Sequence, residues 1–333
     1  MTTVPPVLDV RDLTVDVRAA HGPVRLLHGV SLQLRRGERV ALVGESGSGK
    51  SVFARSLIRL DDAMTVGGSV QFDGADLVTA SERRLREVRG QGIGLVFQDP
   101  LSSLDPVKRI GDQVMEPLVI RGVPKREARE RARDVLDRLG VPNAARRMDA
   151  YPHEFSGGMR QRVCLAMAIV AEPAVLIADE PTTALDVRVQ EQVMQLIEEI
   201  SADGGPAVLL ITHDLGLVAG FAHRVAVMYA GRLIEVAGVD DLYADPRHPY
   251  TRGLLDSVPR IDLHEGDLTA IPGTPASPFH PVGGCPFHPR CAAALEHCAH
   301  EEPLLTVLPS PMPFHDRQVA CHRAGEIVHG RTA

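Results

Sequence analysis

The chain has 333 residues, of which 44% are hydrophobic and 24% charged, and its formal net charge is -7. This acidic balance argues against a nucleic-acid-binding domain, which is usually strongly basic. No run approaches the roughly 20 apolar residues that a membrane-spanning helix needs, and residues 1–9 lack the basic and apolar segments of a signal peptide. We therefore expect a cytosolic chain with one large domain and an appendage.

The first elements surround a glycine-rich loop. We predict strands at residues 7–17, 25–34 and 39–43, a turn at His21-Gly22-Pro23, and a helix over residues 50–60. The last strand and the helix are joined by a run of small and polar residues, Gly44-Glu45-Ser46-Gly47-Ser48-Gly49-Lys50-Ser51. A strand, a glycine loop and a helix in this order are the setting of a P-loop.

The spacing of Gly44, Gly49, Lys50 and Ser51 indicates a nucleoside triphosphate site. Glycines let backbone N–H groups wrap around phosphates, and the start of the following helix favours negative charge there. Lys50 would reach the β- and γ-phosphates, and Ser51 would bind Mg²⁺. Residues 44–51 are therefore the candidate nucleotide loop.

A core strand at residues 92–97 ends at Gln98 and is followed by a predominantly helical stretch. Pro124 opens a helix whose small and apolar residues share one face, and Gly140 ends it. The basic run at residues 125–133 is interpreted as a solvated face of that helix. We expect residues 101–160 to form a helical subdomain inserted into an α/β core.

A second glycine motif, Phe155-Ser156-Gly157-Gly158-Met159-Arg160-Gln161-Arg162, begins a predicted helix that runs to about residue 171. The free N–H groups at a helix start make another anion site. The two glycine motifs lie far apart in the chain. Together they predict a nucleotide held between two domains of this kind.

Two more buried strands, residues 174–178 and 207–212, lead into polar side chains. Asp179 and Glu180 follow the first strand, and His213 follows the second. Parallel strands place their carboxyl ends on the ligand side of a sheet. Asp179 suits an indirect contact to Mg²⁺, Glu180 suits the general base for the attacking water, and Gln98 and His213 could reach the γ-phosphate.

The remaining core elements are a helix at residues 189–200 and a hairpin of residues 224–229 and 232–235. The hairpin turns at Ala230-Gly231. Beyond about residue 245, proline, glycine and histidine dominate and periodicity is weak. We predict a nucleotide-binding domain over residues 1–240 and a C-terminal extension over residues 241–333.

Taken in order, the motifs resemble the ATP-binding subunit of an ABC transporter over about residues 7–240; Thr183-Ala184-Leu185-Asp186 and Thr212-His213-Asp214 also match. The resemblance implies an α/β fold: a P-loop NTPase core of ABC type, with an early antiparallel β subdomain, an inserted helical subdomain and here a cysteine-bearing C-terminal extension.

The same resemblance implies roles for single residues. Ser156, Gly157 and Gly158 would cap the γ-phosphate on the partner's P-loop. Asp186 would lie in the loop that links the two sites of the dimer. Gln98 would contact Mg²⁺ and sense the transmembrane partner. In this family an aromatic residue upstream of the P-loop usually stacks on adenine, but residues 1–52 contain none; Val17 falls near the expected place, with Arg18 and His21 as alternatives.

Three stretches narrow the resemblance to the oligopeptide/dipeptide/nickel importer subfamily and extend it to about residue 321. They are residues 97–106 (FQDPLSSLDP), residues 246–251 (PRHPYT) with Leu254-Leu255, and residues 271–291, from IPG to GCPFHPRC. The resemblance implies an ATPase at the cytoplasmic face of the membrane that drives uptake of di- or oligopeptides. Nickel or another small solute is an alternative cargo, and a soluble ABC ATPase outside transport is a less favoured one.

The implied partners are a sister ATPase subunit, two transmembrane permease subunits and an extracellular substrate-binding protein. Because similar importers often use two different ATPase subunits, a heterodimer is favoured over a homodimer. A rival interpretation treats the extension as a regulatory or dimer-stabilising module. It predicts that loss of the cysteines spares ATP turnover and weakens assembly.

Four of the five cysteines cluster near the end of the chain: Cys285, Cys291, Cys298 and Cys321. In a reducing compartment such clustering points to metal more than to disulfides. Their spacing, C-x5-C-x6-C-x22-C, differs from the paired C-x2-C of most zinc modules.

The subfamily resemblance implies a [4Fe–4S] cluster on these thiolates. Zinc, with His288, His297 or His322 as further ligands, and reduced structural cysteines are the alternatives. Cys164, alone in the helix after the second glycine motif, is predicted to be a small core residue.

Overall fold

The computed structural model describes residues 5–20, 22–182, 185–202, 204–258, 270–308 and 317–326. The chain forms two compact units. We call residues 1–8, 34–38 and 79–211 the helical unit, and residues 9–33, 39–78 and 212–333 the P-loop unit. His21 of the predicted first turn, and Thr183 and Ala184 before Asp186, lie outside the described residues.

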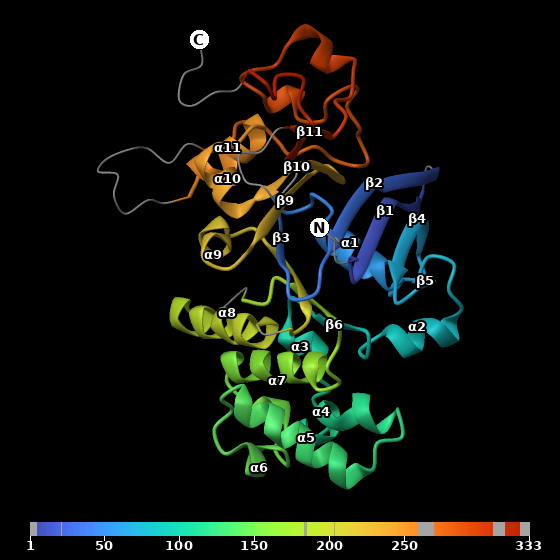
Figure 1. The fold of residues 1–333 in the computed structure, drawn as a ribbon, viewed down its shortest axis with the longest axis vertical. Coiled ribbons are helices and arrows are strands. Elements are labelled where there is room, and N and C mark those ends of the chain that lie inside the picture. The colour runs from blue at the N-terminus through green and yellow to red at the C-terminus, as the bar shows by residue number, and fades with distance from the viewer. Residues whose placement is uncertain are drawn as a thin grey trace. The chain divides into compact units, whose positions relative to one another are not determined.

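A four-stranded sheet in the order β2-β1-β4-β5 begins the P-loop unit (Figure 1). Its strands are β1 (Leu8–Ala19), β2 (Gly22–Leu34), β4 (Met64–Phe72) and β5 (Ala75–Asp76). β1 and β2 confirm the two predicted early strands. Residues 61–91 carry no predicted element, because Gly67 and Gly68 interrupt the apolar pattern of β4. Gly68 has no room for a side chain, since a Cβ there would lie 2.4 Å from the carbonyl oxygen of Asp12.

The second sheet of the P-loop unit is mixed and has the order β11-β12-β10-β9-β3. Its strands are β3 (Arg39–Val43), β9 (Arg224–Tyr229), β10 (Arg232–Gly238), β11 (Thr306–Leu308) and β12 (Arg317–Val319). β3 and β9 are parallel, whereas the other pairs are antiparallel. The predicted hairpin is confirmed, with positive φ at both Ala230 and Gly231. Because β12 pairs with β10, late residues of the chain continue this sheet.

The helices of the P-loop unit are α1 (Lys50–Leu57), α9 (Leu215–Ala219), α10 (Val239–Ala244) and α11 (Pro249–Asp256). Two 3-10 turns, η2 (His288–Arg290) and η3 (Glu296–Ala299), lie among the late cysteines. α1 ends three residues before the predicted end at Leu60. The helix stops because Ile58 leaves helical geometry and Arg59 has a left-handed φ of 48°.

Three parallel strands in the order β8-β7-β6 make the sheet of the helical unit. They are β6 (Ile93–Val96), β7 (Val175–Asp179) and β8 (Ala207–Thr212). Every residue of β7 and β8 is buried, as their continuous apolar runs predict for parallel strands covered on both faces.

The helices of this unit are α2 (Glu82–Val88), α3 (Pro100–Ser103), α4 (Ile110–Val119), α5 (Lys125–Arg138), α6 (Ala144–Arg147), η1 (Pro152–Glu154), α7 (Gly157–Ile169) and α8 (Val187–Ser201). α7 lies between α8 and the pair α4–α5 (Figure 1). Residues 100–154 are thus largely helical, as predicted. In the part of the chain that the structure describes, no helix is both long and apolar enough to cross a membrane.

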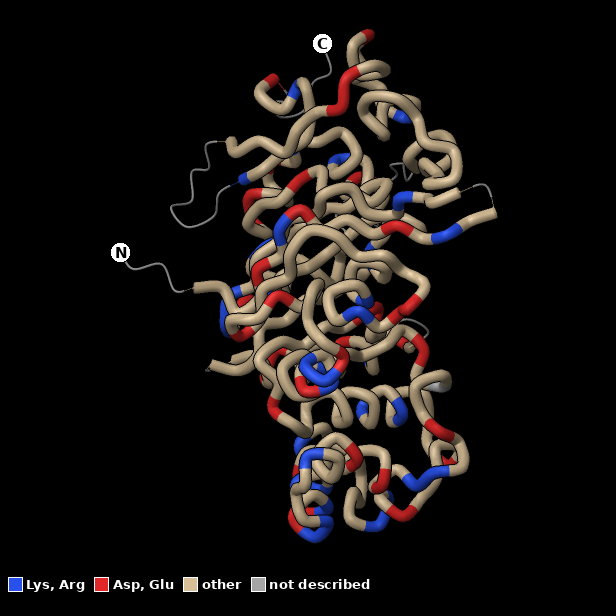
Figure 2. The backbone as a smooth tube through the Cα atoms, turned by 90° about the vertical axis from the view of Figure 1, so that its right-hand side faces the viewer, with Lys and Arg blue, Asp and Glu red and all other residues tan. Residues whose placement is uncertain are grey.

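The basic run in α5 is a solvated face, as predicted. Ala128, Ala132 and Leu136 are buried, while the arginines pair along the helix, Arg126 with Glu130 at 3.5 Å and Arg131 with Glu127 at 2.6 Å. Figure 2 shows Lys and Arg interspersed with Asp and Glu over these helices. Such mixed charge gives no single-sign surface for a polyanion.

Candidate functional site

The glycine loop connects β3 to α1, as predicted, and Lys50 folds back over it. Its Nζ donates to the carbonyl oxygens of Gly44 at 2.7 Å and Glu45 at 2.9 Å, and lies 3.5 Å from Ser48 Oγ. Lys50 is only 5% exposed, so this loop encloses the ammonium. Ser51 follows it in the first turn of α1.

Gly44 and Gly49 are required by geometry. Gly44 has a φ of +153°, and a Cβ there would meet the carbonyl oxygen of Met228 at 2.2 Å. Gly49, with a φ of +109°, has Leu27 Cδ2 at 3.0 Å from its would-be Cβ. Backbone atoms exclude a side chain at Gly44 and the positive φ disfavours one at Gly49, so the backbone is left free to approach a phosphate closely.

Gln98 and Glu180 meet in the helical unit at the carboxyl ends of β6 and β7. These strands are parallel neighbours, with Val96 opposite Ala178. Gln98 Nε2 donates to Glu180 Oε2 at 2.8 Å. Asp179, the last residue of β7, is 2% exposed. Gln98, Asp179 and Glu180 thus lie at one edge of this sheet, where the parallel pairing of their strands places them.

Glu180 has an unusual backbone. Its φ is 48°, in the left-handed region that non-glycine residues rarely occupy, and its N–H donates to the carbonyl oxygen of Ile211 at 2.9 Å. Such conformations cost about 1–3 kcal/mol and concentrate at functional sites.

Ser156 and Asp186, which the sequence resemblance connects with the dimer, are both N-cap residues. Ser156 caps α7, with its Oγ 3.4 Å from the N–H of Met159, so Gly157 and Gly158 form the first turn. Asp186 caps α8 and accepts from the N–H of Val189 at 3.0 Å. The N–H groups at the start of α7 suit an anion.

His213 directly follows β8 and is exposed. It belongs to the P-loop unit, as do residues 44–51, whereas Gln98, Ser156, Asp179, Glu180 and Asp186 belong to the helical unit. The candidate ATPase residues therefore fall into two groups, one in each unit. Cys164 is buried, as predicted, and burial raises its pKa to about 12.

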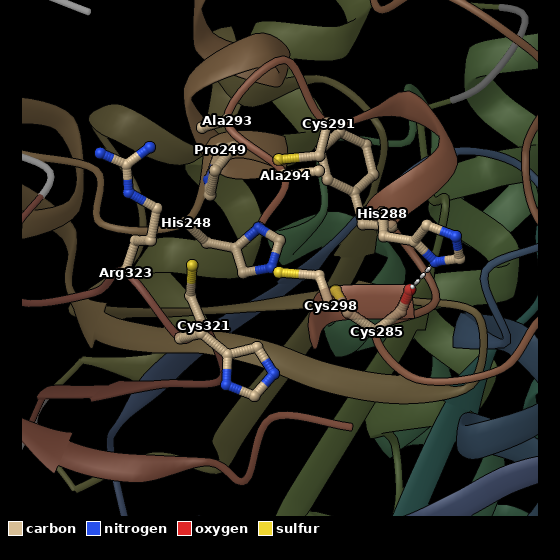
Figure 3. Close-up of a pocket in the computed structure, with 12 residues that line it drawn as sticks. His248, Pro249, Cys285, His288, Cys291, Ala293, Ala294, Cys298, Cys321 and Arg323 are labelled. Atoms are coloured by element: carbon tan, nitrogen blue, oxygen red, sulfur yellow. Dashed lines mark hydrogen bonds between the residues drawn. The ribbon is translucent and has the colours of Figure 1, made fainter. Parts of the chain in front are cut away.

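The four late cysteines line one small cavity of the P-loop unit with His248 and Phe287, a convergence that their spacing alone does not show. In Figure 3 the sulfur atoms of Cys291, Cys298 and Cys321 face a common space. All four cysteines are free thiols. Burial raises the pKa of Cys285 and Cys291, and that of Cys321 to about 11. A metal must therefore displace protons to bind here.

The histidines near these cysteines have different surroundings. Among the described residues, three potential ligand atoms lie mutually within 4.8 Å at His297, Cys298 and His322. His288 is engaged differently, because its Nδ1 lies 2.9 Å from the carbonyl oxygen of Cys285.

Two residues that the sequence reasoning missed contact the P-loop. The hydroxyl oxygen of Tyr250 accepts from the N–H of Glu45 at 2.7 Å, and Arg290 pairs with the Glu45 carboxylate at 2.6 Å. The hydrogen bonding of Arg290 to Glu45 raises the pKa of Arg290 above its ordinary value. Both residues lie in stretches that carried the subfamily resemblance, but no local pattern signals a contact across more than 200 residues.

A P-loop, a strand ending in Asp-Glu, a glycine-rich helix start and an appended antiparallel sheet define an ATPase of the ABC class. Residues 27–183 match the family model "ABC transporter", and residues 234–298 match "Oligopeptide/dipeptide transporter, C-terminal region". The chain belongs to the ATP-binding proteins of ABC transporters, in the oligopeptide/dipeptide subfamily. It is an ABC ATPase, in which ATP hydrolysis is coupled to transport.

Relatives of known sequence match this chain over most of its length. A putative peptide import ATP-binding protein of Brucella abortus is 48% identical over 305 residues, 91% of this chain and 92% of that protein. The oligopeptide transport ATP-binding protein OppD of Salmonella typhimurium is 46% identical over 89% of each chain. The ATP-binding cassette MJ0796, a dimer bound to ADP and phosphate, has a TM-score of 0.63 and 28% identity over 70% of this chain and 98% of its own.

Proposed function

We propose that this chain is the ATP-hydrolysing subunit of an importer of di- or oligopeptides, held peripherally at the cytoplasmic face of the membrane. The observation that carries the proposal is the match of residues 234–298 to the C-terminal region of oligopeptide/dipeptide transporters. That segment contains Tyr250 and Arg290, which contact the P-loop. The Brucella and Salmonella relatives, a putative peptide import protein and an oligopeptide transport protein, support the same cargo class. ATP-dependent uptake of a labelled peptide by the assembled transporter tests it; uptake of nickel alone would contradict it.

We assign the chemistry to residues at the two strand edges. Lys50 and the free N–H groups of residues 44–51 hold the phosphates, while Ser51 and Gln98 provide oxygen ligands for Mg²⁺ and Asp179 contacts the ion indirectly. Glu180 acts as the base that takes a proton from the attacking water, and His213 contacts the γ-phosphate. The hydrogen bond from Gln98 keeps the Glu180 carboxylate oriented.

We further propose that Ser156, Gly157 and Gly158 complete the nucleotide site of a second ATPase subunit, with Asp186 in the connecting loop. ABC cassettes dimerise and work with permease subunits. The favoured assembly is a heterodimer with a sister ATPase, two transmembrane permeases and an extracellular binding protein. The α7 start supports this, because the N–H groups at a helix N-terminus attract a phosphate.

Replacing Ser156 with Arg should lower hydrolysis at the partner's P-loop about 10²-fold, because the new side chain blocks the α7 anion site. The measurement is single-site turnover in complexes that pair one variant subunit with one normal subunit. Ser81→Arg is the matched control, since Ser81 caps α2 with the same 3.4 Å geometry. A larger loss at the variant's own P-loop would contradict the assignment.

We propose that the four-cysteine cavity holds a [4Fe–4S] cluster. Four free thiols around one cavity fit the donor set of such a cluster. A single zinc ion, with Zn–S bonds of about 2.3 Å, would hold its ligands roughly 3.8 Å apart. Among the described residues, three potential ligand atoms lie within 4.8 Å of one another in a group that contains one cysteine and two histidines. The group His297, Cys298 and His322 is the corresponding zinc alternative.

Protein purified without oxygen should show the broad visible absorption of an iron–sulfur cluster, with matching iron and sulfide content. Cys291→Ser should abolish that absorption. Cys164→Ser should leave it unchanged, because Cys164 is buried in α7 and does not line the cavity. A colourless protein with one zinc ion per chain, or one with no metal, would overturn the cluster proposal.

A further inference from the structure

Glu45, inside the P-loop, is held on both its backbone and its side chain by the C-terminal extension. Its N–H donates to Tyr250 Oη of α11 at 2.7 Å. Its carboxylate accepts two hydrogen bonds from Arg290 of η2, at 2.6 Å from Nη1 and 3.0 Å from Nη2. All three residues belong to the P-loop unit. The side chain of Arg290 is 4% exposed and that of Glu45 is 27% exposed, so the pair is largely shielded from solvent.

Arg290 does not depend on Glu45 for its position. Its Nε donates to the carbonyl oxygen of Pro272 at 2.8 Å, and Nη2 donates to that of Ile271 at 3.3 Å. The guanidinium also lies 5.9 Å from the ring centres of Tyr229 and Phe287. It is a preorganised cation that the extension supplies, and the bidentate geometry fixes the carboxylate against it.

The negative charge of Glu45 opposes the binding of phosphates by the P-loop that contains it. The P-loop binds a polyanion through N–H groups and Lys50, and Lys50 Nζ already contacts the carbonyl oxygen of Glu45. An unpaired carboxylate in this loop would repel a bound polyanion. A fixed guanidinium removes that repulsion.

We propose that Arg290 is a positioning residue for ATP binding: it neutralises and orients Glu45, so that the C-terminal extension sets the nucleotide affinity of this P-loop. The inference rests on the proposed assignment of residues 44–51 to the phosphates.

A purely structural role for the pair predicts a different outcome. If it only attached the extension to the loop, Glu45→Gln and Arg290→Met would both disturb the loop and weaken nucleotide binding. Under the proposal the two changes act in opposite directions. Arg290→Met leaves a carboxylate beside the phosphates, whereas Glu45→Gln leaves a cation that Pro272 and Ile271 still hold in place.

The test is the Kd of the full chain for MgADP by calorimetry. Arg290→Met should weaken binding about tenfold, Glu45→Gln should strengthen it several-fold, and the double variant should return toward the normal value. Both single effects should shrink in high salt. Arg290→Lys, which keeps the charge, should recover part of the affinity. If Arg290→Met does not fold, Glu45→Gln and Arg290→Lys decide the question.

Weaker binding by Glu45→Gln, or no change in any variant, would overturn the inference. Lys50→Ala separates this failure from failure of the underlying assignment. If Lys50→Ala binds MgADP normally, residues 44–51 are not the phosphate site. If Lys50→Ala loses binding while Glu45 and Arg290 variants shift in the same direction, the site assignment stands and the role of Arg290 falls.

Discussion

Glu180→Gln should lower the rate of ATP hydrolysis by about 10²–10⁴-fold, the usual contribution of a general base. The amide keeps the size of the side chain and its hydrogen-bonding reach to Gln98, which lies 2.8 Å from the carboxylate. It cannot accept a proton from water. ATP should therefore still bind, and the variant should accumulate as an ATP-bound dimer, detectable by size-exclusion chromatography with MgATP.

Glu172→Gln is the matched control for this change. Glu172 also has a left-handed φ, 54° against 48° for Glu180, and it lies just before β7 in the same unit. Loss of a carboxylate at a strained backbone position is thus common to both variants, but only Glu180 follows the strand that ends in Asp179. Near-normal hydrolysis by Glu180→Gln, or equal losses in the two variants, would refute the assignment of the base.

The local motifs were predictable because each depends on a few adjacent residues. Strand β3 and residues 44–51 confirm the expected P-loop setting, and Gly44 and Gly49 have the backbone angles that only glycine adopts easily. The meeting of Gln98 with Glu180 follows from parallel pairing of β6 and β7. In each case the geometry follows from one strand and the segment next to it, either in the chain or in the sheet.

Long-range features were not predictable from the sequence. Nothing near Glu45 indicates that Tyr250 and Arg290 contact it, since neither a hydrophobic period nor a turn signal encodes contacts between such distant residues. The convergence of four cysteines on one cavity depends on how short turns such as η2 and η3 pack. The predicted division near residue 240 remains a prediction, although β12 pairs with β10 across it.

Removing the side chain of Glu235 should cause the largest loss of stability in the extension. Glu235 in β10 is fully buried and accepts hydrogen bonds from the N–H groups of Arg247 and His248, both at 2.9 Å, and from Arg317 at 2.7 Å. Glu235→Ala would leave a buried guanidinium and two N–H groups without this acceptor. Breaking such a buried pair costs about 3–5 kcal/mol. Hydrogen exchange of the amides in β10–β12 and α11 should show this loss as faster local opening.

The exposed pair Arg232–Glu302 provides the control on the same strand. Its two hydrogen bonds, at 2.5 and 3.0 Å, are as short as those of Glu235, but the Glu302 side chain is 47% exposed. Solvent screening limits such pairs to about 0–1 kcal/mol, so Glu302→Ala should change exchange little. Equal effects of the two variants would show that burial does not decide the strength of these pairs. His248 caps α11, and α11 carries Tyr250, which accepts a hydrogen bond from the N–H of Glu45. Local unfolding at Glu235 should therefore also weaken the contact between the extension and Glu45.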